Sequence, residues 1–397
     1  MRSLRKFTLA LGTLTAACGN CIHAATLSQS IPEENHVHWW NGLSLVNHLD
    51  IEGVANLSGG QTRGSTATGL WKGALALHTD KAGWWSGGLF LVEGLVANSG
   101  NPNAYVGDLQ GVSNLTTPFA HISRLYKAYY RQTSGPLTVR VGLINPNDYF
   151  NTTGVAADLF NASYGIYPII SLNLPYTPTY PYSSLGVMAN YQVDDTTFQV
   201  GIFNADGYTP FRRPWLSDGQ IYYGEIDQAL HWGPGTVTLK AGSYYNHVSS
   251  DYLQNANDPN AAAIGIAPSQ GGFYGAAEYR WKAAGMDWGS FVQGGGAPND
   301  ASVSPVNAYV AAGLRLRNFV PNSPKSTLSL GFDRAWQRQS GAETAIEINF
   351  RQPVFKDFYV QPDLQYVVNP GANAVGAQVP NALVGILRIG WRGSLTG

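Results

Sequence analysis

Sixteen segments of the sequence carry apolar residues at alternate positions, and the gaps between these segments alternate between short and long. A period of two is typical of a β-strand with one apolar face. The segments lie at 43–55, 68–79, 86–97, 121–132, 137–143, 185–193, 196–204, 219–230, 235–246, 271–282, 285–295, 306–317, 325–335, 341–352, 357–368 and 381–391. Most are close to the length that a tilted strand needs to cross a bilayer.

The order of the gaps restricts the fold further. Short gaps lie at 133–136, 194–195, 231–234 and 283–284, and long gaps at 98–120, 144–184, 205–218, 247–270 and 369–380. A membrane barrel has short periplasmic turns and long external loops, whereas a soluble sandwich has no reason to sort its loops. The pattern predicts an all-β chain, a transmembrane antiparallel β-barrel of about 16 strands. We expect 98–120, 205–218 and 247–270 to be external.

The composition agrees with this prediction. Charged residues make up 12% of the chain, about half the usual share of a globular protein. After the N-terminus no apolar run is long enough for a membrane-spanning helix. A barrel strand needs an apolar residue only at every second position.

The N-terminus has the pattern of a secretory signal peptide. Arg2, Arg5 and Lys6 precede an apolar stretch at 7–17, and Ala24 is a small residue suited to cleavage. The chain is therefore divided into a signal peptide (1–24), a short irregular periplasmic lead-in (25–42) and the barrel (43–397). A lipoprotein acylated at Cys18 is the alternative.

Several classes of function are excluded by what the mature chain lacks. Cys18 and Cys21 are the two cysteines, and both lie in the predicted signal peptide, which excludes disulfides and zinc–thiolate sites. Cleavage removes three of the 24 basic residues and leaves 25 acidic ones, a balance of −4, so nucleic acid is not an expected partner. The histidines lack a third ligand at metal spacing. We expect no metal, no cofactor and, without a nucleophile-elbow or phosphate-loop motif, no enzyme activity.

Strand alternation assigns side chains to the two faces of the wall. In 306–317 the lipid face carries Val306, Val310 and Leu314. In 341–352 the lipid face carries Ile348. Near the midplane a cation on the lipid face costs about 2–4 kcal/mol, so charged residues are assigned to the lumen. The expected lumen charges are Lys72, Arg140, Glu278, Arg280, Arg315, Arg317, Glu347, Arg351, Asp363 and Arg388.

Two local assignments complete the wall. Segment 121–132 is ambiguous, because Arg124 and Lys127 fall on opposite faces. Outward aromatic residues are expected at the membrane interfaces, with Trp84 and Trp85 at a short turn.

Several blocks of sequence, in order, resemble the OprB-type carbohydrate-selective porins. They read GLWKGALALHTDKAGWWSGGLFLVEG (69–94), DLQGVSN (108–114), RLYKAYYRQ (124–132), VRVGLINPNDYFN (139–151), DLFNASYG (158–165), QVGIFN (199–204) and QPDLQYVVNPG (361–371). The resemblance implies a sixteen-stranded outer-membrane barrel that admits monosaccharides and related small solutes. Two features depart from the family pattern: Lys127 stands where an acidic residue is expected, and 392–397 follow the last aromatic residue, Trp391.

The gap at 144–184 is the third long one and, at 41 residues, is too long to be only a connector. We expect it to fold into the lumen and narrow the pore. Aromatic rings can stack on the C–H faces of sugars while amides, carboxylates and arginines bond the hydroxyls. The predicted contacts are Asp148, Tyr149, Phe150 and Asn151, with Arg140 and Arg315 from the wall; a cap over the barrel is the alternative.

The sequence therefore predicts a passive porin for small sugars in the bacterial outer membrane. Its expected partners are small sugars, outer-membrane lipid and the barrel-assembly machinery, and a homotrimer is one arrangement open to it. A general diffusion porin without sugar selectivity and a secreted all-β glycan-binding protein or glycosidase remain alternatives.

Overall fold

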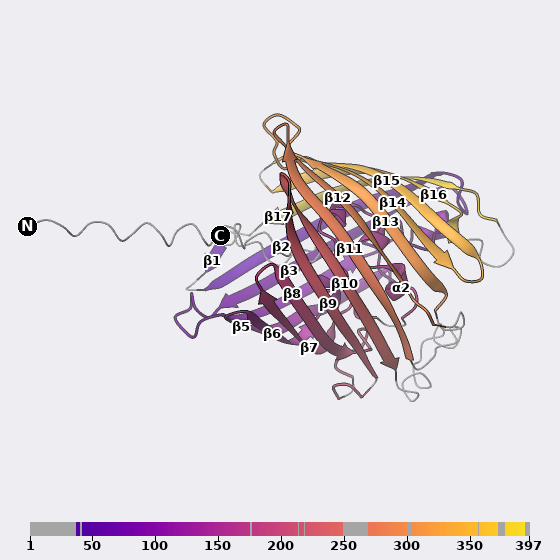
Figure 1. The fold of residues 1–397 in the computed structure, drawn as a ribbon. Helices are drawn as coiled ribbons and strands as arrows, with labels where there is room; N and C mark the ends of the chain where they lie inside the picture. Colours follow the sequence, from indigo (N-terminus) through magenta and orange to yellow (C-terminus); the bar gives the residue numbers. More distant parts are fainter. Residues whose placement is uncertain are drawn as a thin grey trace, which may run out of the picture.

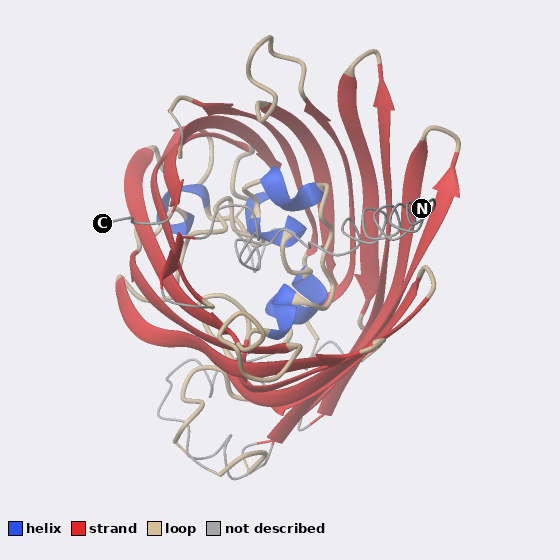
Figure 2. Cartoon of the chain, turned by 90° about the vertical axis from the view of Figure 1, so that its left-hand side faces the viewer, coloured by secondary structure: helices blue, strands red, loops and turns tan. Residues whose placement is uncertain are grey.

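The barrel is closed by sixteen antiparallel strands (Figures 1 and 2). The computed structural model describes residues 37–39, 42–174, 177–212, 214–217, 219–248, 269–299, 304–355, 357–371 and 378–393. The strands are β2 (Leu43–Ser58), β3 (Gly64–His78), β4 (Gly88–Asn98), β5 (His121–Ser134), β6 (Leu137–Ile144), β7 (Ser184–Val193), β8 (Thr196–Asn204), β9 (Gly219–Trp232), β10 (Gly235–Val248), β11 (Ser269–Ala283), β12 (Met286–Gly296), β13 (Val306–Arg317), β14 (Thr327–Gln337), β15 (Gly341–Pro353), β16 (Phe358–Val368) and β17 (Ala382–Gly393). Each coincides with a predicted segment, and β17 pairs with β2 to close the ring.

A seventeenth, short strand precedes the barrel. β1 (Val37–Trp39) pairs with β2 opposite Leu43–Leu45. On its other side this part of β2 already pairs with β3, so β1 occupies the edge that β17 leaves when it ends at Gly393. The predicted irregular lead-in thus contains a strand, whereas the predicted signal peptide lies outside the described residues.

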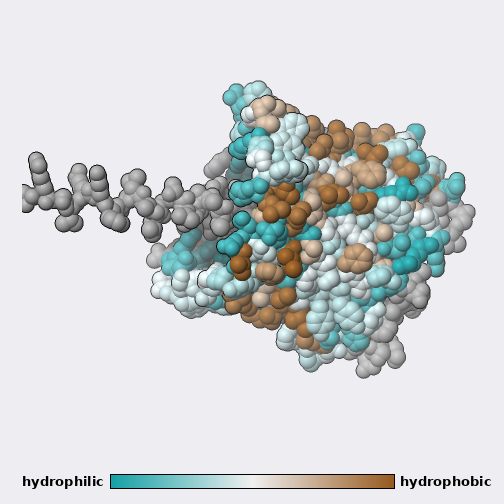
Figure 3. Space-filling view, viewed as in Figure 1, coloured by the Kyte–Doolittle hydropathy of each residue, from teal (hydrophilic) through white to brown (hydrophobic). Residues whose placement is uncertain are grey.

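The alternation of side chains explains why these segments form a membrane wall. In β15 the outward Ile346 and Ile348 are 44% and 46% exposed, while the inward Glu347 between them is fully buried. Apolar side chains gather on the outer surface of the wall (Figure 3). Trp84 and Trp85 are exposed at the β3–β4 turn, and their place in an interfacial girdle stays a prediction.

Two β-bulges change the face assignments that simple alternation predicted. In β5 the register shifts so that Glu93 pairs with Lys127 and Gly94 with Leu125, and Tyr126 lies between them. Because one extra residue reverses the parity, both Tyr126 and Lys127 point inward and the ambiguity at 121–132 disappears. A second shift in β13 turns Val306 into the interior, so its assignment to the lipid face was wrong.

The long gaps hold the remaining elements. Loop 2 (residues 99–120) contains α1 (Asn103–Val106), and loop 3 (residues 145–183) contains η2 (Pro146–Asp148), η3 (Ala156–Asp158), η4 (Ala162–Tyr164) and α2 (Pro168–Ser171). These helices lie inside the ring of strands (Figure 2). Within the described ranges, no helix is long and apolar enough to cross a membrane. Most of the gap at 247–270 lies outside the described residues.

Candidate solute pathway through the barrel

Loop 3 folds into the lumen, as its length predicted, and carboxylates of the wall hold its backbone. Each bond joins a loop N–H to a wall glutamate: Asn151 to Glu225 at 2.8 Å, Val155 to Glu278 at 2.6 Å, and Phe160 and Asn161 to Glu347 at 2.5 and 2.9 Å. The glutamates come from β9, β11 and β15, so the anchors follow the curve of the wall. Hydrogen bonds to an ionised acceptor are among the stronger ones in proteins. The path of loop 3 is therefore fixed at several separate points.

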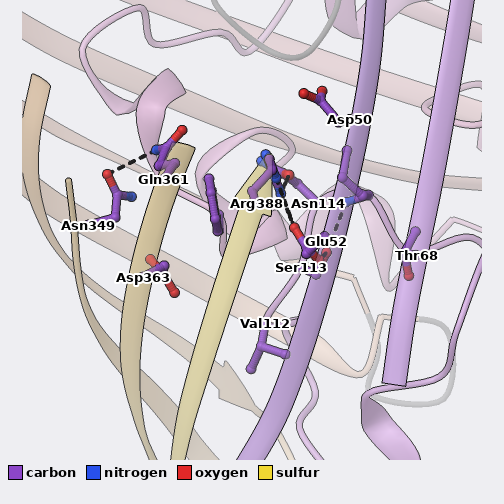
Figure 4. A network of polar contacts seen from close by, with 12 residues as sticks. Asp50, Glu52, Thr68, Val112, Ser113, Asn114, Asn349, Gln361, Asp363 and Arg388 are labelled. Carbon is purple, nitrogen blue, oxygen red and sulfur yellow. Dashed lines mark hydrogen bonds and ion pairs between the residues drawn. The ribbon is translucent and has the colours of Figure 1, made fainter. Parts of the chain in front are cut away.

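Loop 2 folds inward as well. Glu343 accepts hydrogen bonds from the backbone N–H groups of Leu109 and Gln110 at 2.6 and 2.9 Å. Glu52 accepts one from the Ser113 hydroxyl (Figure 4). Residues 98–120 were predicted to form an external loop, and that prediction gave no indication of this inward path. The wall carboxylates that draw loop 2 inward lie more than 60 residues away in the chain.

The two inward loops also bond to each other. Backbone N–H groups of Asn114 and Ala162 each donate to a carbonyl of the other loop at 2.8 Å. The Tyr180 hydroxyl of loop 3 donates to the Leu115 carbonyl of loop 2 at 2.8 Å. Arg388 of the wall donates to Glu52 and to the Asn114 side chain, which ties loop 2 to β17 and β2 (Figure 4). The lumen is thus narrowed by one bonded unit made from both loops.

Asp158 is the main electrostatic anchor of loop 3. Its carboxylate lies 2.7 Å from Arg317, 3.6 Å from Arg315 and 3.8 Å from Arg351, all inward residues of the wall. Burial raises the pKa of Asp158, but the guanidinium groups, Arg317 first, outweigh this effect and bring the pKa from 3.8 to about 2. Arg315 also donates to the Gly154 carbonyl at 2.7 Å. Arg315, which was predicted to contact the sugar, therefore holds loop 3 in place.

Lys127, the departure from the family pattern, bridges the wall and loop 3. Its ammonium group lies 3.1 Å from Glu93 of β4 and 3.1 Å from Asp148 of loop 3. Asp148 also accepts a hydrogen bond from the Asn145 amide at 2.7 Å. All three charged side chains are nearly buried. Asp148 is thus brought to the start of the constriction, with its charge balanced by Lys127.

Tyr149 and Arg140 meet at the partly open side of loop 3. The Arg140 guanidinium lies 4.5 Å from the centre of the Tyr149 ring and donates to the Asn190 side chain at 2.8 Å. The Tyr149 hydroxyl donates to the Tyr129 hydroxyl at 3.3 Å. Tyr149, Arg140 and Tyr129 are all partly exposed. These three side chains, which we call the tyrosine–arginine step, present an aromatic face and hydrogen-bonding groups to the lumen.

Phe150 and Asn151 are buried, and their environment differs from that of the preceding Asp148 and Tyr149. Phe150 is 0% exposed and stacks on Tyr223 at 5.0 Å, with Phe203 against its edge. Asn151 is buried, has a positive φ of 48° and donates its backbone N–H to Glu225. The structure therefore places both residues against the wall, away from the open lumen. Tertiary contacts with distant strands, which no local pattern reveals, hold them there.

The remaining predicted lumen charges all point inward and take part in packing or ion pairs. Lys72 lies 5.9 Å from the centre of the Tyr126 ring. Arg280 pairs with Glu278 at 2.9 Å, and Asp363 accepts from the Gln365 amide at 3.1 Å. Figure 4 shows Asp363 and Arg388 on neighbouring strands. Lys72, Arg280 and Asp363 thus contact other residues of the wall, whereas Arg388 also bonds Asn114 of loop 2.

A cavity of about 600 Å³ lies between loop 2 and loop 3. Amide side chains and three tyrosines, Tyr126, Tyr180 and Tyr182, form much of its lining, together with apolar residues. Its charged lining residues are one cation, Lys72, and one acid, Asp108. Burial raises the pKa of Asp108 above its ordinary value, which further limits negative charge. Over the described part of its lining, the cavity surface is mainly apolar, carries several amide and hydroxyl groups, and is nearly uncharged.

Sequence reasoning did not identify the loop-2 side of this cavity or Tyr129. Loop 2 spans the gap at 98–120, and that length already exceeds the usual connector. The block DLQGVSN (108–114), which resembles the family, falls in the same segment. These two features could have indicated a functional loop, but neither one gives the inward direction of its path. In the described part of the chain, no group of three or more His, Cys, Asp or Glu residues is arranged to hold a metal ion.

Solved structures of outer-membrane channels have the same fold. The high-pH structure of Pseudomonas putida OprB matches with a TM-score of 0.74 at 20% identity, over 88% of this chain and 94% of that one. The outer-membrane channel DcaP of Acinetobacter baumannii matches with a TM-score of 0.50 at 13% identity, over 88% and 96% of the two chains. No curated protein matches the sequence. The model of the carbohydrate-selective porin family OprB matches residues 68–392, which is most of the chain, so this protein belongs to the OprB family of carbohydrate-selective porins.

Proposed function

We propose that this outer-membrane porin is a passive channel for neutral sugars of about monosaccharide size, and that it selects them in the space between loops 2 and 3. The observation that carries this proposal is the nearly uncharged cavity of about 600 Å³ between the two loops. Small-ligand sites of this volume combine apolar and aromatic surface with a few fixed polar groups. A neutral sugar offers the matching chemistry, with C–H faces for the tyrosines and hydroxyls for the amides.

The tyrosine–arginine step supplies a second contact along the path. A sugar that leaves the cavity meets an aromatic face at Tyr149 and donors from Arg140, each already oriented by other contacts. Conduction requires binding that is favourable enough for entry and weak enough for release. Two partial sites in series suit this requirement better than one closed pocket. We propose that Phe150 and Asn151 hold loop 3 against the wall.

Diffusion through such a pore needs no catalytic residue, and we propose that the protein is not an enzyme. Its proposed partners are the diffusing sugars, the lipid around the apolar wall and the machinery that assembles outer-membrane barrels. Cleavage near Ala24 remains a proposal that rests on the sequence, and a homotrimer stays one arrangement open to the protein. The general diffusion porin is the competing function, because it would share the barrel but not the sugar contacts.

Liposome swelling with purified protein tests this function. Swelling rates are measured with glucose and with an uncharged, non-sugar solute of similar size, for the wild type and for Tyr149→Ala. We expect the wild type to admit glucose faster than the comparison solute, and Tyr149→Ala to reduce this preference about three- to tenfold, the effect of losing one stacking contact. Tyr366→Ala, which removes an exposed aromatic ring from the outer face, is the matched control. Equal rates for both solutes in the wild type would favour the general porin.

A further inference from the structure

Three aromatic side chains from three different loops meet beside the cavity. Phe119 of loop 2 stacks on Tyr208 of the β8–β9 loop, with ring centres 5.6 Å apart and planes inclined by 24°. Tyr208 contacts Tyr182 of loop 3 edge to face at 5.5 Å. We call Phe119, Tyr182 and Tyr208 the rim cluster. Its members are distant in sequence, so the cluster exists only because the three loops fold together.

The rim cluster is held from behind by the wall. The guanidinium group of Arg124 lies 4.9 Å from the centre of the Tyr182 ring. It also donates hydrogen bonds to the backbone carbonyls of Gly207 and Tyr208 at 3.2 and 3.3 Å. One inward residue of β5 thus positions both tyrosines. β4 pairs with β5 at Arg124, but β6 pairs with β5 only from Ala128 onward, so on the β6 side the loops and not a strand lie beside Arg124.

The acid nearest to the cluster is occupied by its own loop. Asp206 is 2% exposed. Its carboxylate accepts from the backbone N–H groups of Tyr208 and Thr209 at 2.7 and 3.2 Å, and from the Thr209 hydroxyl at 2.5 Å. These bonds make the loop a tight turn and keep the carboxylate away from solvent. The exposed surface of the cluster is therefore aromatic and not anionic.

The cluster is continuous with the cavity. Tyr182 and Pro118 line the cavity, and Phe119 follows Pro118 in the chain. Phe119 and Tyr208 remain 45% and 42% exposed. Aromatic surface therefore extends without interruption from the interior of the pathway to its rim. A solute that slides along Tyr182 reaches the cavity without leaving an aromatic face.

We propose that the rim cluster is an outer capture site for the C–H face of a neutral sugar ring, which then passes along Tyr182 into the cavity. This inference rests on the proposed function, because it assigns that function an entry step. Flat rings favour a flat apolar partner, and because Arg124 and Asp206 beside the cluster are already bonded to loop groups, a neutral partner is favoured. Because the rings are open on one side, binding there is weak, as a site on a conducting path requires.

The proposal has a directional consequence. The cluster lies on the route between the outer solution and the cavity, so removing it leaves the affinity of the inner sites unchanged. Microscopic reversibility then requires that entry from the outer side and exit to that side slow by the same factor. Entry from the inner side keeps its rate. A merely structural role for these residues would have no such asymmetry.

Single-channel recording with glucose added to one side at a time tests the proposal. The variant Phe119→Leu/Tyr208→Leu keeps apolar bulk for loop packing but removes the flat ring faces. We expect the rate of glucose block from the outer side to fall about three- to tenfold, the effect of about one stacking contact. Block from the inner side should keep its wild-type rate, and the open-channel conductance should be unchanged.

Two comparisons make the result specific. Phe211→Leu/Trp215→Leu removes other exposed rings of the β8–β9 loop and should leave all rates unchanged. Sorbitol, an open-chain polyol without a rigid ring face, should enter wild type and variant at the same rate. Unchanged outer-side glucose entry in the cluster variant, or an equal loss in the Phe211 and Trp215 control, would overturn the capture site. If wild-type current shows no glucose block from either side, the proposed function itself fails.

Discussion

Replacing Glu347 by Gln is expected to loosen loop 3 while leaving the barrel folded. Glu347 accepts the backbone N–H groups of Phe160 and Asn161 at 2.5 and 2.9 Å. Gln keeps one acceptor oxygen but turns an NH₂ group toward one of these two donors. The variant therefore loses one charge-assisted hydrogen bond, weakens the other and leaves a buried N–H without its partner.

The size of this effect follows from the contacts. Bonds to a charged acceptor contribute about 1.5–3 kcal/mol each, and a buried donor left without a partner costs about 1–3 kcal/mol. Since these two estimates overlap, we expect a net loss of roughly 2–4 kcal/mol in the attachment of this part of loop 3. At 1.36 kcal/mol for each factor of ten, local release becomes about 30- to 1000-fold more frequent.

Single-channel recording can detect this release. We expect Glu347→Gln to add brief states of higher conductance and to weaken glucose block, because the constriction opens when the segment around Phe160 detaches. The strand pairing of β15 does not involve this side chain, so heat-modifiable mobility on gels should persist. Asp195→Asn makes the same charge change at an exposed short turn and is the control. Identical current records for Glu347→Gln and wild type would refute the anchoring role.

Three further predictions concern the wall and the loop anchors. Ile348→Arg should impair membrane insertion, because Ile348 faces outward and a lipid-facing Arg costs about 2–4 kcal/mol near the midplane. Thr238→Arg, opposite the inward Glu278, should insert normally. The folded fraction of each variant is measured in urea titrations, and equal folded fractions for Ile348→Arg and Thr238→Arg would contradict the assigned faces. Lys127→Met should destabilise the protein by about 3–5 kcal/mol, since it leaves Glu93 and Asp148 without their shared cation, and Lys127→Met/Glu93→Gln should recover part of this loss. Because the pKa of Asp158 is lowered from 3.8 to about 2, its ion pairs should hold loop 3 fully above pH 3.8 and weaken as the pH falls to about 2. Conductance should therefore rise only in that acidic range, and a rise that persists in Asp158→Asn must come from another group.

The wall of this barrel could be predicted because its information is local. Each strand repeats with a period of two, so the apolar Ile346 and Ile348 and the polar Glu347 between them identify the two faces. The exceptions arise where one residue is inserted into a strand. The bulge at Tyr126 and the register shift at Val306 reverse the parity, and neither has a distinctive sequence.

The site was harder to predict, because its contacts connect distant parts of the chain. The length of the gap at 144–184 predicted an inward loop, and Tyr149 and Arg140 do meet. Phe150, the next residue, packs on Tyr223, more than 70 residues away. The inward path of loop 2 likewise depends on Glu343, more than 230 residues away. A single sequence shows that such a carboxylate faces the lumen, but not which backbone segment it binds.

The dependence of single-channel current on glucose concentration tests the central claim most directly. If sugars bind between loops 2 and 3, added glucose must occupy the pathway and exclude ions. The current should therefore fall along a saturating curve, beyond the small decrease in the conductivity of the bulk solution. A current that follows only the bulk conductivity at every glucose concentration would contradict a sugar-selective pathway and would identify the protein as a general diffusion pore.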